Sequence, residues 1–298
     1  MTARSAATVI PVLNGAHTIG ATLDALSKQV GGRREVIVVD NGSTDGTADV
    51  VAGFPGVRLL HEATRGAAAA RNCGLRATSA DVVAFCDADT IPTRRWLAEM
   101  VAAFDDPAVM LAAGQIVCYP PKTPAERYLA ASGVYDVERA VCRPMFPLAP
   151  SGHMAVRRSA ALAVDGFDET MITAEDADFC HRVMTKFPEP IAYRAGAVVF
   201  HRSRPSAEEL RRQAWVYGEG VARLYRRYPN LLPWDLRRIL LVAVRSAGRA
   251  VLPAILSAGH RLRLVPERNV EFASYHRLWT WYFWRGFFRL YYRGEAAQ

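Results

Sequence analysis

The hydrophobic positions change their period repeatedly through the first hundred residues. Short apolar runs rich in β-branched residues have the character of strands covered on both faces. They lie at residues 7–13, 35–39, 57–60 and 82–86. Between the runs, apolar residues recur at helical spacing, at residues 19–30, 67–77 and 96–104. Strands that alternate with helices form right-handed βαβ units, so the pattern predicts an α/β fold with a mostly parallel, Rossmann-like sheet flanked by helices.

Polar residues gather where three of these strands end. They occupy residues 11–15 after the first strand, 40–46 after the second and 87–89 after the fourth. In parallel α/β sheets, ligands bind outside the carboxyl ends of the strands, where loops lead into helices. We therefore expect the three clusters to line one rim of the sheet.

Asp87 and Asp89 follow the fourth strand with one alanine between them. Two carboxylates so close raise each other's pKa unless a cation neutralises them. Mg²⁺ and Mn²⁺ accept carboxylate oxygens and bridge to phosphates. The alternative is that both acids cap the helix that begins near Arg94. His201 ends another apolar run in the same way, which makes it a candidate third metal ligand.

A second acidic cluster, Glu175, Asp176 and Asp178, opens a helical apolar pattern. Acids in a first helical turn each contribute about 0.3–1 kcal/mol through the helix dipole, which is one sufficient explanation. Three acids in four residues exceed what capping needs. A carboxylate facing a substrate cleft serves as general base for an acceptor hydroxyl, which is the functional alternative.

Taken in order, these motifs resemble those of family 2 glycosyltransferases of the GT-A fold. The matching segments are residues 9–14 (VIPVLN), 35–47 (EVIVVDNGSTDGT), 65–66 together with 70–74 (RG and ARNCG), 87–89 (DAD), 151–158 (SGHMAVRR), 166–169 (GFDE), 175–178 (EDAD) and His201. They span about two-thirds of the chain, in the family's order. Each is weak alone, but eight in register are a strong indication.

The resemblance implies a role for each matching residue. On the donor side, Asp40 with Pro11 and Asn14 would face the nucleoside, Arg71 would hold base or phosphate, Asp87 would contact the ribose, and Ser151, Gly152 and His153 would line the sugar pocket. Asp89, with Asp87 and His201, would hold the divalent metal, Mn²⁺ or Mg²⁺. Asp176 would be the catalytic base, assisted by Glu175.

The implied reaction is an inverting transfer from a nucleotide-sugar donor. Asp176 would take the acceptor hydroxyl's proton while that oxygen attacks the anomeric carbon, and the metal and arginines would offset charge on the departing diphosphate. The chain lacks the Q-x-x-R-W motif of the chain-building relatives; its nearest segment is residues 213–217. This departure favours addition of a single sugar over polymerisation. His153 stands where many such relatives have asparagine or another polar residue, which leaves the donor sugar open.

Charge divides the chain unevenly. The formal net charge is +8, yet residues 1–200 hold 19 basic and 22 acidic residues, whereas residues 201–298 hold 18 arginines, no lysine and 7 acidic residues. Such asymmetry indicates an anionic partner for the C-terminal third. No nucleic-acid-binding motif accompanies it, so lipid headgroups or a phosphorylated ligand are the expected partners.

Three helical segments fill that C-terminal third. Residues 206–228 begin with a capping-box pattern, and residues 239–257 form an apolar stretch interrupted by Arg245 and Arg249. Central arginines cost about 2.5–3.5 kcal/mol each in a membrane span, so an in-plane helix with a cationic stripe through Arg238 is expected. The aromatic run at 278–293 suits a membrane interface. Its alternative is packing within the protein or a homodimer.

These observations predict a catalytic domain at residues 1–205 and a helical, basic-aromatic extension at 206–298. Five scattered cysteines without a CxxC pair indicate reduced thiols, hence a cytoplasmic protein, peripheral at the cytoplasmic face of the cell membrane. The acceptor would be a glycan or a lipid-linked, cell-envelope glycan. Two alternatives stay open: a sugar-1-phosphate nucleotidyltransferase, although its glycine-rich phosphate loop is missing, and a non-catalytic nucleotide-sugar-binding or membrane-associated module.

Overall fold

The structure, a computed structural model, describes residues 4–31, 34–144, 146–202 and 206–293. The chain forms two compact units. The first comprises Met1–Tyr119 and Asp136–Arg202, and the second comprises Pro120–Tyr135 and Ser203–Gln298. Residues 120–135, which the sequence-based division placed with the first domain, thus group with the C-terminal helices.

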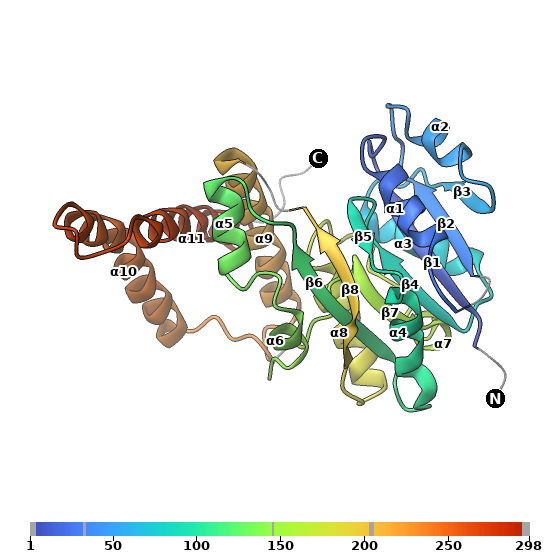
Figure 1. The fold of residues 1–298 in the computed structure, drawn as a ribbon. Helices are drawn as coiled ribbons and strands as arrows, with labels where there is room; N and C mark the ends of the chain where they lie inside the picture. The colour runs from blue at the N-terminus through green and yellow to red at the C-terminus, as the bar shows by residue number, and fades with distance from the viewer. Residues whose placement is uncertain (1–3, 32–33, 145, 203–205, 294–298) are drawn as a thin grey trace. The chain divides into compact units, whose positions relative to one another are not determined.

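An eight-stranded mixed sheet forms the centre of the first unit, in the order β3-β2-β1-β4-β7-β6-β8-β5 (Figure 1). Its strands are β1 (Ala6–Val12), β2 (Glu35–Asp40), β3 (Val57–His61), β4 (Val82–Cys86), β5 (Thr90–Pro92), β6 (Leu111–Cys118), β7 (His153–Arg157) and β8 (Ala192–His201). The pairings among β1 to β4 are parallel, as is that of β6 with β8, while β7 runs antiparallel to both of its neighbours. The predicted α/β fold is confirmed.

Helices cover both faces of this sheet. One face packs against α1 (Ile19–Ser27), α2 (Thr47–Ala52), α4 (Trp96–Ala102) and the short η1 (Ala103–Asp105). The other face packs against α3 (Ala67–Ala77), α6 (Val137–Val141), α7 (Arg158–Leu162) and α8 (Glu175–Lys186). Strand residues consequently divide between two cores, with Val9 in one and Ile10 in the other. This two-sided burial explains the continuous apolar runs.

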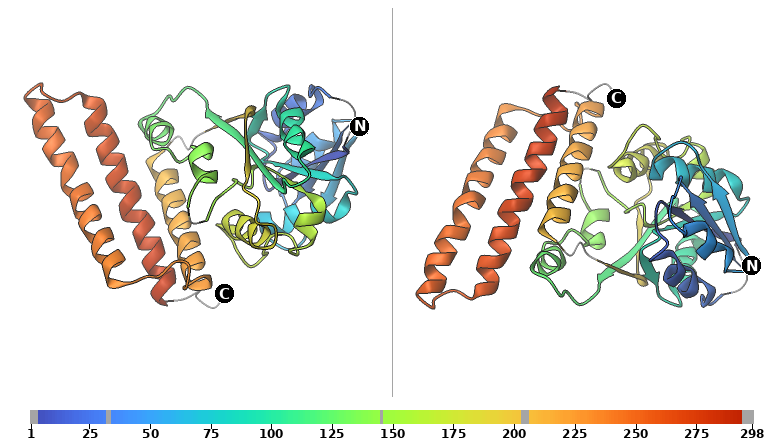
Figure 2. Two further views of the ribbon diagram at one scale, coloured as in Figure 1. Left: turned by 90° about the horizontal axis from the view of Figure 1, so that it is seen from below. Right: turned by 90° about the horizontal axis from the view of Figure 1, so that it is seen from above.

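The second unit is helical. It contains α5 (Pro124–Ala131), α9 (Ala207–Arg227), α10 (Leu236–Arg261) and α11 (Glu267–Arg293), and Figure 2 shows the last three as long helices side by side. Helices α9 and α11 approach so closely that a Cβ on Gly218 would lie 1.9 Å from the carbonyl oxygen of Phe283, and one on Gly286 would lie 2.2 Å from that of Trp215. Only glycine permits this approach.

The aromatic run of α11 packs mainly inside this unit. Phe287 is fully buried, and Trp279 and Trp284 pack against buried residues of the unit, whereas Trp281 is exposed. Packing within the protein, the alternative to an interfacial belt, therefore accounts for most of the run.

Helix α10 is the single helix in the described part of the chain that is long and apolar enough to cross a membrane, judged by length and composition alone. The expected cationic stripe is corrected: Arg249 donates to Thr280 Oγ1 of α11 at 3.2 Å, and the Arg238 guanidinium lies over the Tyr225 ring of α9. Two of the three arginines thus face neighbouring helices. Arg245 is exposed, but most exposed side chains of α10 are apolar, with Val244 70% exposed and Ile255 62% exposed.

Candidate functional site

The strand directions bring the predicted site residues to one edge of the sheet. Asp40 ends β2, Asp87 follows β4, and both strands run parallel to β1 between them. Because β7 is antiparallel to β4, its first residue, His153, pairs with Cys86 at the same edge. Strand β8 ends at His201, also on this side. The expectation of a single rim is confirmed.

The loops after β1 and β2 are joined by side-chain hydrogen bonds. Asn14 has a left-handed backbone (φ 53°), which asparagine tolerates, and its Oδ1 accepts from the Thr44 amide at 2.8 Å. Its own amide donates to Ser43 Oγ at 2.9 Å. Asp40 is buried, and its Oδ1 accepts from the Ser43 amide at 2.9 Å. Asn14 and Asp40 therefore lie in one preformed rim segment beside Pro11, a residue of β1.

Arg71 of α3 links the two acidic clusters. Its guanidinium is only 5% exposed, and it donates to Asp87 Oδ1 and to Glu175 Oε1, each at 3.0 Å. Its Nε has no hydrogen-bond partner although it is buried. Removing either carboxylate would leave the buried charge of the guanidinium partly unpaired, which is energetically costly. Arg71 thus fixes the end of β4 relative to the start of α8.

Gly152 lies directly against the Asp87 carboxylate. A Cβ at this position would lie 2.0 Å from Asp87 Oδ2, so no larger residue fits without moving that group. The next residue upstream, Ser151, donates from Oγ to Glu175 Oε1 at 3.1 Å. The turn before β7 therefore contacts both acidic clusters.

Asp176 occupies the first turn of α8. Ala174, with a left-handed backbone (φ 61°), turns the chain immediately before it. Asp176 Oδ1 accepts from the Ala177 amide at 2.8 Å, and Oδ2 accepts from the Ser151 amide at 3.4 Å. Burial, followed by the neighbouring charge of Glu175, raises the pKa of Asp176 to about 7. A carboxyl that titrates near neutral pH suits proton transfer.

His153 departs from its expected place in the sugar pocket. Its side chain is 1% exposed, Nδ1 accepts from Trp96 Nε1 at 3.1 Å, and Nε2 donates to the Ala197 carbonyl at 3.1 Å. Burial lowers the pKa of His153 to about 4, which keeps the ring neutral. Both ring nitrogens are engaged by the protein, so His153 supports the sheet and has none left for a donor sugar.

Asp89 and His201 are brought near one another by strand pairing, because Thr90, the residue after Asp89, pairs with His201. Their donor atoms, with those of Asp87, are of the type that Mn²⁺ and Mg²⁺ accept. Among the described residues, however, no three His, Cys, Asp or Glu side chains converge closely enough to form a ready metal cluster. The donor set fits a divalent ion chemically, with Asp87 held by Arg71.

Asn72 is a residue whose role the sequence interpretation did not assign. It is buried, its Nδ2 donates to the Phe167 carbonyl and to Glu169 Oε1, and its Oδ1 accepts from the Phe167 amide, all at 2.8 Å. Gly166 (φ 71°) makes room, since a Cβ there would meet Asn72 Oδ1 at 2.3 Å. These hydrogen bonds join the 70–74 and 166–169 motifs, which lie far apart in the sequence.

Comparisons with known proteins identify the family of the chain and its fold. The family model described as Glycosyl transferase family 2 matches residues 8–164. The pre-mycofactocin glycosyltransferase of Mycobacterium tuberculosis (strain H37Rv) is 36% identical over 236 residues, which cover 76% of this chain and 49% of that protein. Glycosyltransferase AglE of Haloferax volcanii is 29% identical over 257 residues, covering 83% of this chain and 80% of AglE.

Among solved structures, the mannosyltransferase PcManGT from Pyrobaculum calidifontis, in complex with GDP-Man and Mn²⁺, is similar in fold. The TM-score is 0.67 at 23% identity, and the match covers 98% of this chain and 88% of that one. The chain spans about half the length of the mycobacterial relative. The fold is that of GT-A glycosyltransferases, and the match over residues 8–164 places the chain in glycosyl transferase family 2.

Proposed function

We propose that this chain is an inverting, metal-dependent glycosyltransferase that moves one sugar from a nucleotide-sugar donor to an acceptor hydroxyl. The observation that carries the proposal is the buried Arg71, which contacts Asp87 on one side and Glu175 on the other. The turn at Ser151 and Gly152 contacts Asp87, on the proposed donor side, and also Glu175 and Asp176, whose pKa is raised. This is the arrangement that transfer between two bound substrates requires.

On the donor side, the preformed loops around Asn14 and Asp40 would hold the nucleoside, with Pro11 beside them. Asp40 Oδ1 accepts one backbone hydrogen bond, and Oδ2, which lies 3.6 Å from His61 Nδ1, has acceptor capacity left for a base or ribose donor. Asp87, about two-fifths exposed, would contact the ribose, and Arg71 would hold it in place. Ser151 and Gly152 would face the sugar.

A divalent ion would be held by Asp89 and His201, with Asp87 adjacent. When bound, such an ion offsets negative charge on the leaving diphosphate. PcManGT, similar in fold, binds GDP-Man and Mn²⁺, which supports a nucleotide-sugar and a divalent ion here. The base and sugar of this chain's own donor are not specified by that similarity.

On the acceptor side, Asp176 would accept the proton of the attacking hydroxyl. Its raised pKa makes it a stronger base than an ordinary aspartate while leaving it substantially ionised at neutral pH. Glu175, held by Arg71 and Ser151, would keep this carboxyl in an acidic neighbourhood. A single displacement with Asp176 as base inverts the anomeric configuration and needs no covalent sugar–enzyme intermediate.

The acceptor is proposed to be a glycan or a lipid-linked glycan at the cytoplasmic membrane face. The support is the exposed apolar face of α10 together with the arginine-rich composition of residues 201–298. Anionic lipids attract such a surface. The chain would then be membrane-attached while its catalytic unit works in the cytoplasm.

The test pairs binding with transfer. Asp176→Asn should retain the thermal stabilisation that the matching nucleoside diphosphate-sugar gives with Mn²⁺, and should lose sugar transfer by roughly a hundredfold or more. Asp89→Ala should lose the metal-dependent part of the stabilisation. If Asp176→Asn transfers sugar at the wild-type rate, Asp176 is not the base. If no nucleotide stabilises the wild-type protein, the donor site is absent.

A further inference from the structure

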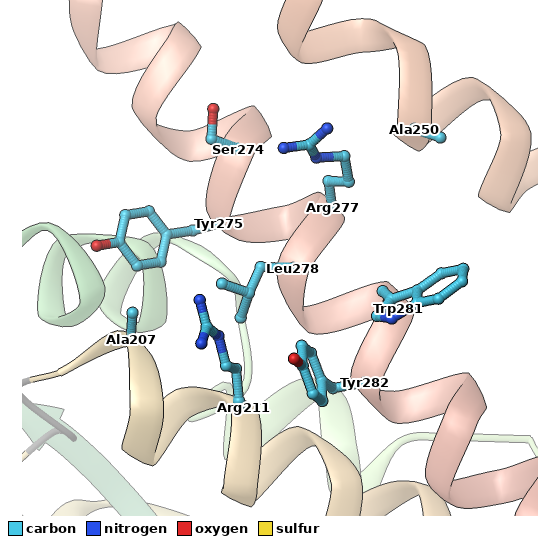
Figure 3. A pocket seen from close by; sticks show the side chains of 9 residues that line it. All are labelled: Ala207, Arg211, Ala250, Ser274, Tyr275, Arg277, Leu278, Trp281 and Tyr282. Atoms are coloured by element: carbon cyan, nitrogen blue, oxygen red, sulfur yellow. The ribbon is translucent and has the colours of Figure 1, made fainter.

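A cavity of about 540 Å³ lies within the helical unit, between α9, α10 and α11 (Figure 3). Helix α9 contributes Arg211, α10 contributes Ala250, and α11 contributes most of the remaining wall, including Arg277, Leu278 and Trp281. Figure 3 shows Arg211 reaching from α9 toward Leu278, beside the ring of Tyr282. None of these residues belongs to the candidate transferase site.

The positive charge of the residues that line the cavity is suited to an anionic ligand. Two guanidinium groups line the cavity, no carboxylate does, and within residues 206–293 neither Arg211 nor Arg277 forms an ion pair with a described acid. The Arg211 guanidinium lies 5.7 Å from the centroid of the Tyr282 ring. Stacking of this kind restrains the side chain and leaves its N–H donors available to a phosphate, which arginine binds through paired hydrogen bonds.

The cavity is also lined by apolar residues, which are suited to a hydrocarbon portion of the same ligand. Leu278 forms part of the lining, and Trp281, another lining residue, is 65% exposed. Ala250 lies on the flank of α10, and the next residue, Val251, lies on its outward apolar face with Val244 and Ile255. The cavity is therefore adjacent to an exposed apolar strip. A soluble anion makes no use of such a strip, whereas a lipid does.

We propose that this cavity binds the phosphate of an anionic membrane phospholipid, whose acyl chains lie against the outward face of α10. The inference rests on the membrane attachment proposed above, and it is independent of the transfer reaction. Membrane binding would then involve a specific site for the lipid headgroup as well as nonspecific electrostatic attraction. Arg211 and Arg277 hold the phosphate, and Val244, Val251 and Ile255 contact hydrocarbon.

The experiment compares two double variants of the full-length chain that remove the same charge. Arg211→Gln/Arg277→Gln removes the arginines of the cavity. Arg212→Gln/Arg268→Gln removes two exposed arginines of the same helices that do not line it. Each protein is mixed with vesicles of phosphatidylcholine alone or with added phosphatidylglycerol, and the bound fraction is measured by flotation at physiological salt.

We expect the wild-type protein to bind the phosphatidylglycerol vesicles more tightly than the neutral ones. The cavity variant should lose roughly tenfold or more in affinity, and the control less than about threefold, because only the former loses paired contacts to phosphate. Circular dichroism and stabilisation by the nucleotide-sugar should be unchanged in both variants. That readout separates the cavity from the transferase site.

Three outcomes would overturn the proposal. Equal losses in the two variants would show diffuse electrostatics without a headgroup site. Absence of wild-type binding to either vesicle would exclude the membrane attachment as well, while nucleotide stabilisation would still report on the donor site. Stabilisation by inorganic phosphate alone, lost in the cavity variant and accompanied by no difference on vesicles, would identify a soluble anion as the ligand.

Discussion

Arg71 illustrates how a single side chain joins parts of the site that are distant in sequence. It reaches residue 87 at the end of β4 and residue 175 at the start of α8, and it is almost wholly buried. The A-R-N-x-G segment indicated a functional arginine, but no pattern in the sequence named both of its partners. Contacts across 16 and 104 residues follow from the sheet order, which local periodicity does not encode.

Gly152→Ala tests the close approach of the β7 turn to Asp87. The added methyl would overlap Asp87 Oδ2 and displace the carboxylate from Arg71, so we expect donor affinity to fall by roughly tenfold or more. Nucleotide-induced thermal shifts measure it. Gly248→Ala, on α10 where a Cβ meets no atom within 4 Å, is the control and should bind donor normally. Wild-type affinity in Gly152→Ala would show that Asp87 does not contact the donor.

Glu175→Gln tests the electrostatic origin of the Asp176 pKa. Burial and then the charge of Glu175 raise that pKa to about 7, so removing the charge lowers it. Since the base acts when ionised, transfer should rise with pH through the free-enzyme pKa, and the acidic limb of kcat/KM should move to lower pH in the variant. Glu175→Asp, which keeps the charge, should leave the limb near its wild-type position. An unmoved limb in Glu175→Gln would exclude Asp176 as the titrating group.

At the scale of elements, the sequence predicted the parallel part of the sheet better than the rest. Strands β1 to β4 and their helices follow from clear changes of period. Strands β5 to β7 do not, because β5 has only three residues and β7 runs antiparallel to both of its neighbours. Because β7 lies within the sheet, His153 at its start is buried against Trp96. This explains why His153, which was expected to line the sugar pocket, is part of the core.

Asn72→Ala tests the connection between α3 and residues 166–169. The substitution removes three hydrogen bonds and leaves buried backbone groups of Phe167 without a partner, so we expect a loss of about 2–4 kcal/mol in the free energy of unfolding. Urea denaturation measures it. Asn269→Ala, an exposed position of α11, should change stability by less than about 0.5 kcal/mol. Similar small effects at both positions would show that this contact contributes little.

For the molecule as a whole, charge and exposed apolar surface coincide in the helical unit. The sequence indicated an anionic partner for residues 201–298 and assigned the cationic face to α10. In the structure Arg238 and Arg249 turn toward neighbouring helices instead, Arg245 stays exposed, and most of the other exposed side chains of α10 are apolar. The composition identified residues 201–298 as the basic part of the chain. Which face each arginine occupies depends on how α9, α10 and α11 pack, which helical spacing alone does not determine.

Val244→Asn/Ile255→Asn tests whether this face acts through its apolar character. Both side chains are more than 60% exposed, so the change costs little folding stability but removes apolar area that would enter a bilayer. Each side chain contributes about 1.5 kcal/mol or more when buried, which predicts at least a hundredfold loss of vesicle binding for the pair. We also expect the wild-type protein to self-associate without detergent and the variant to stay monodisperse, as measured by light scattering. Retention of vesicle binding together with wild-type self-association would mean that this face contacts neither lipid nor another copy of the chain, and that the arginines act alone.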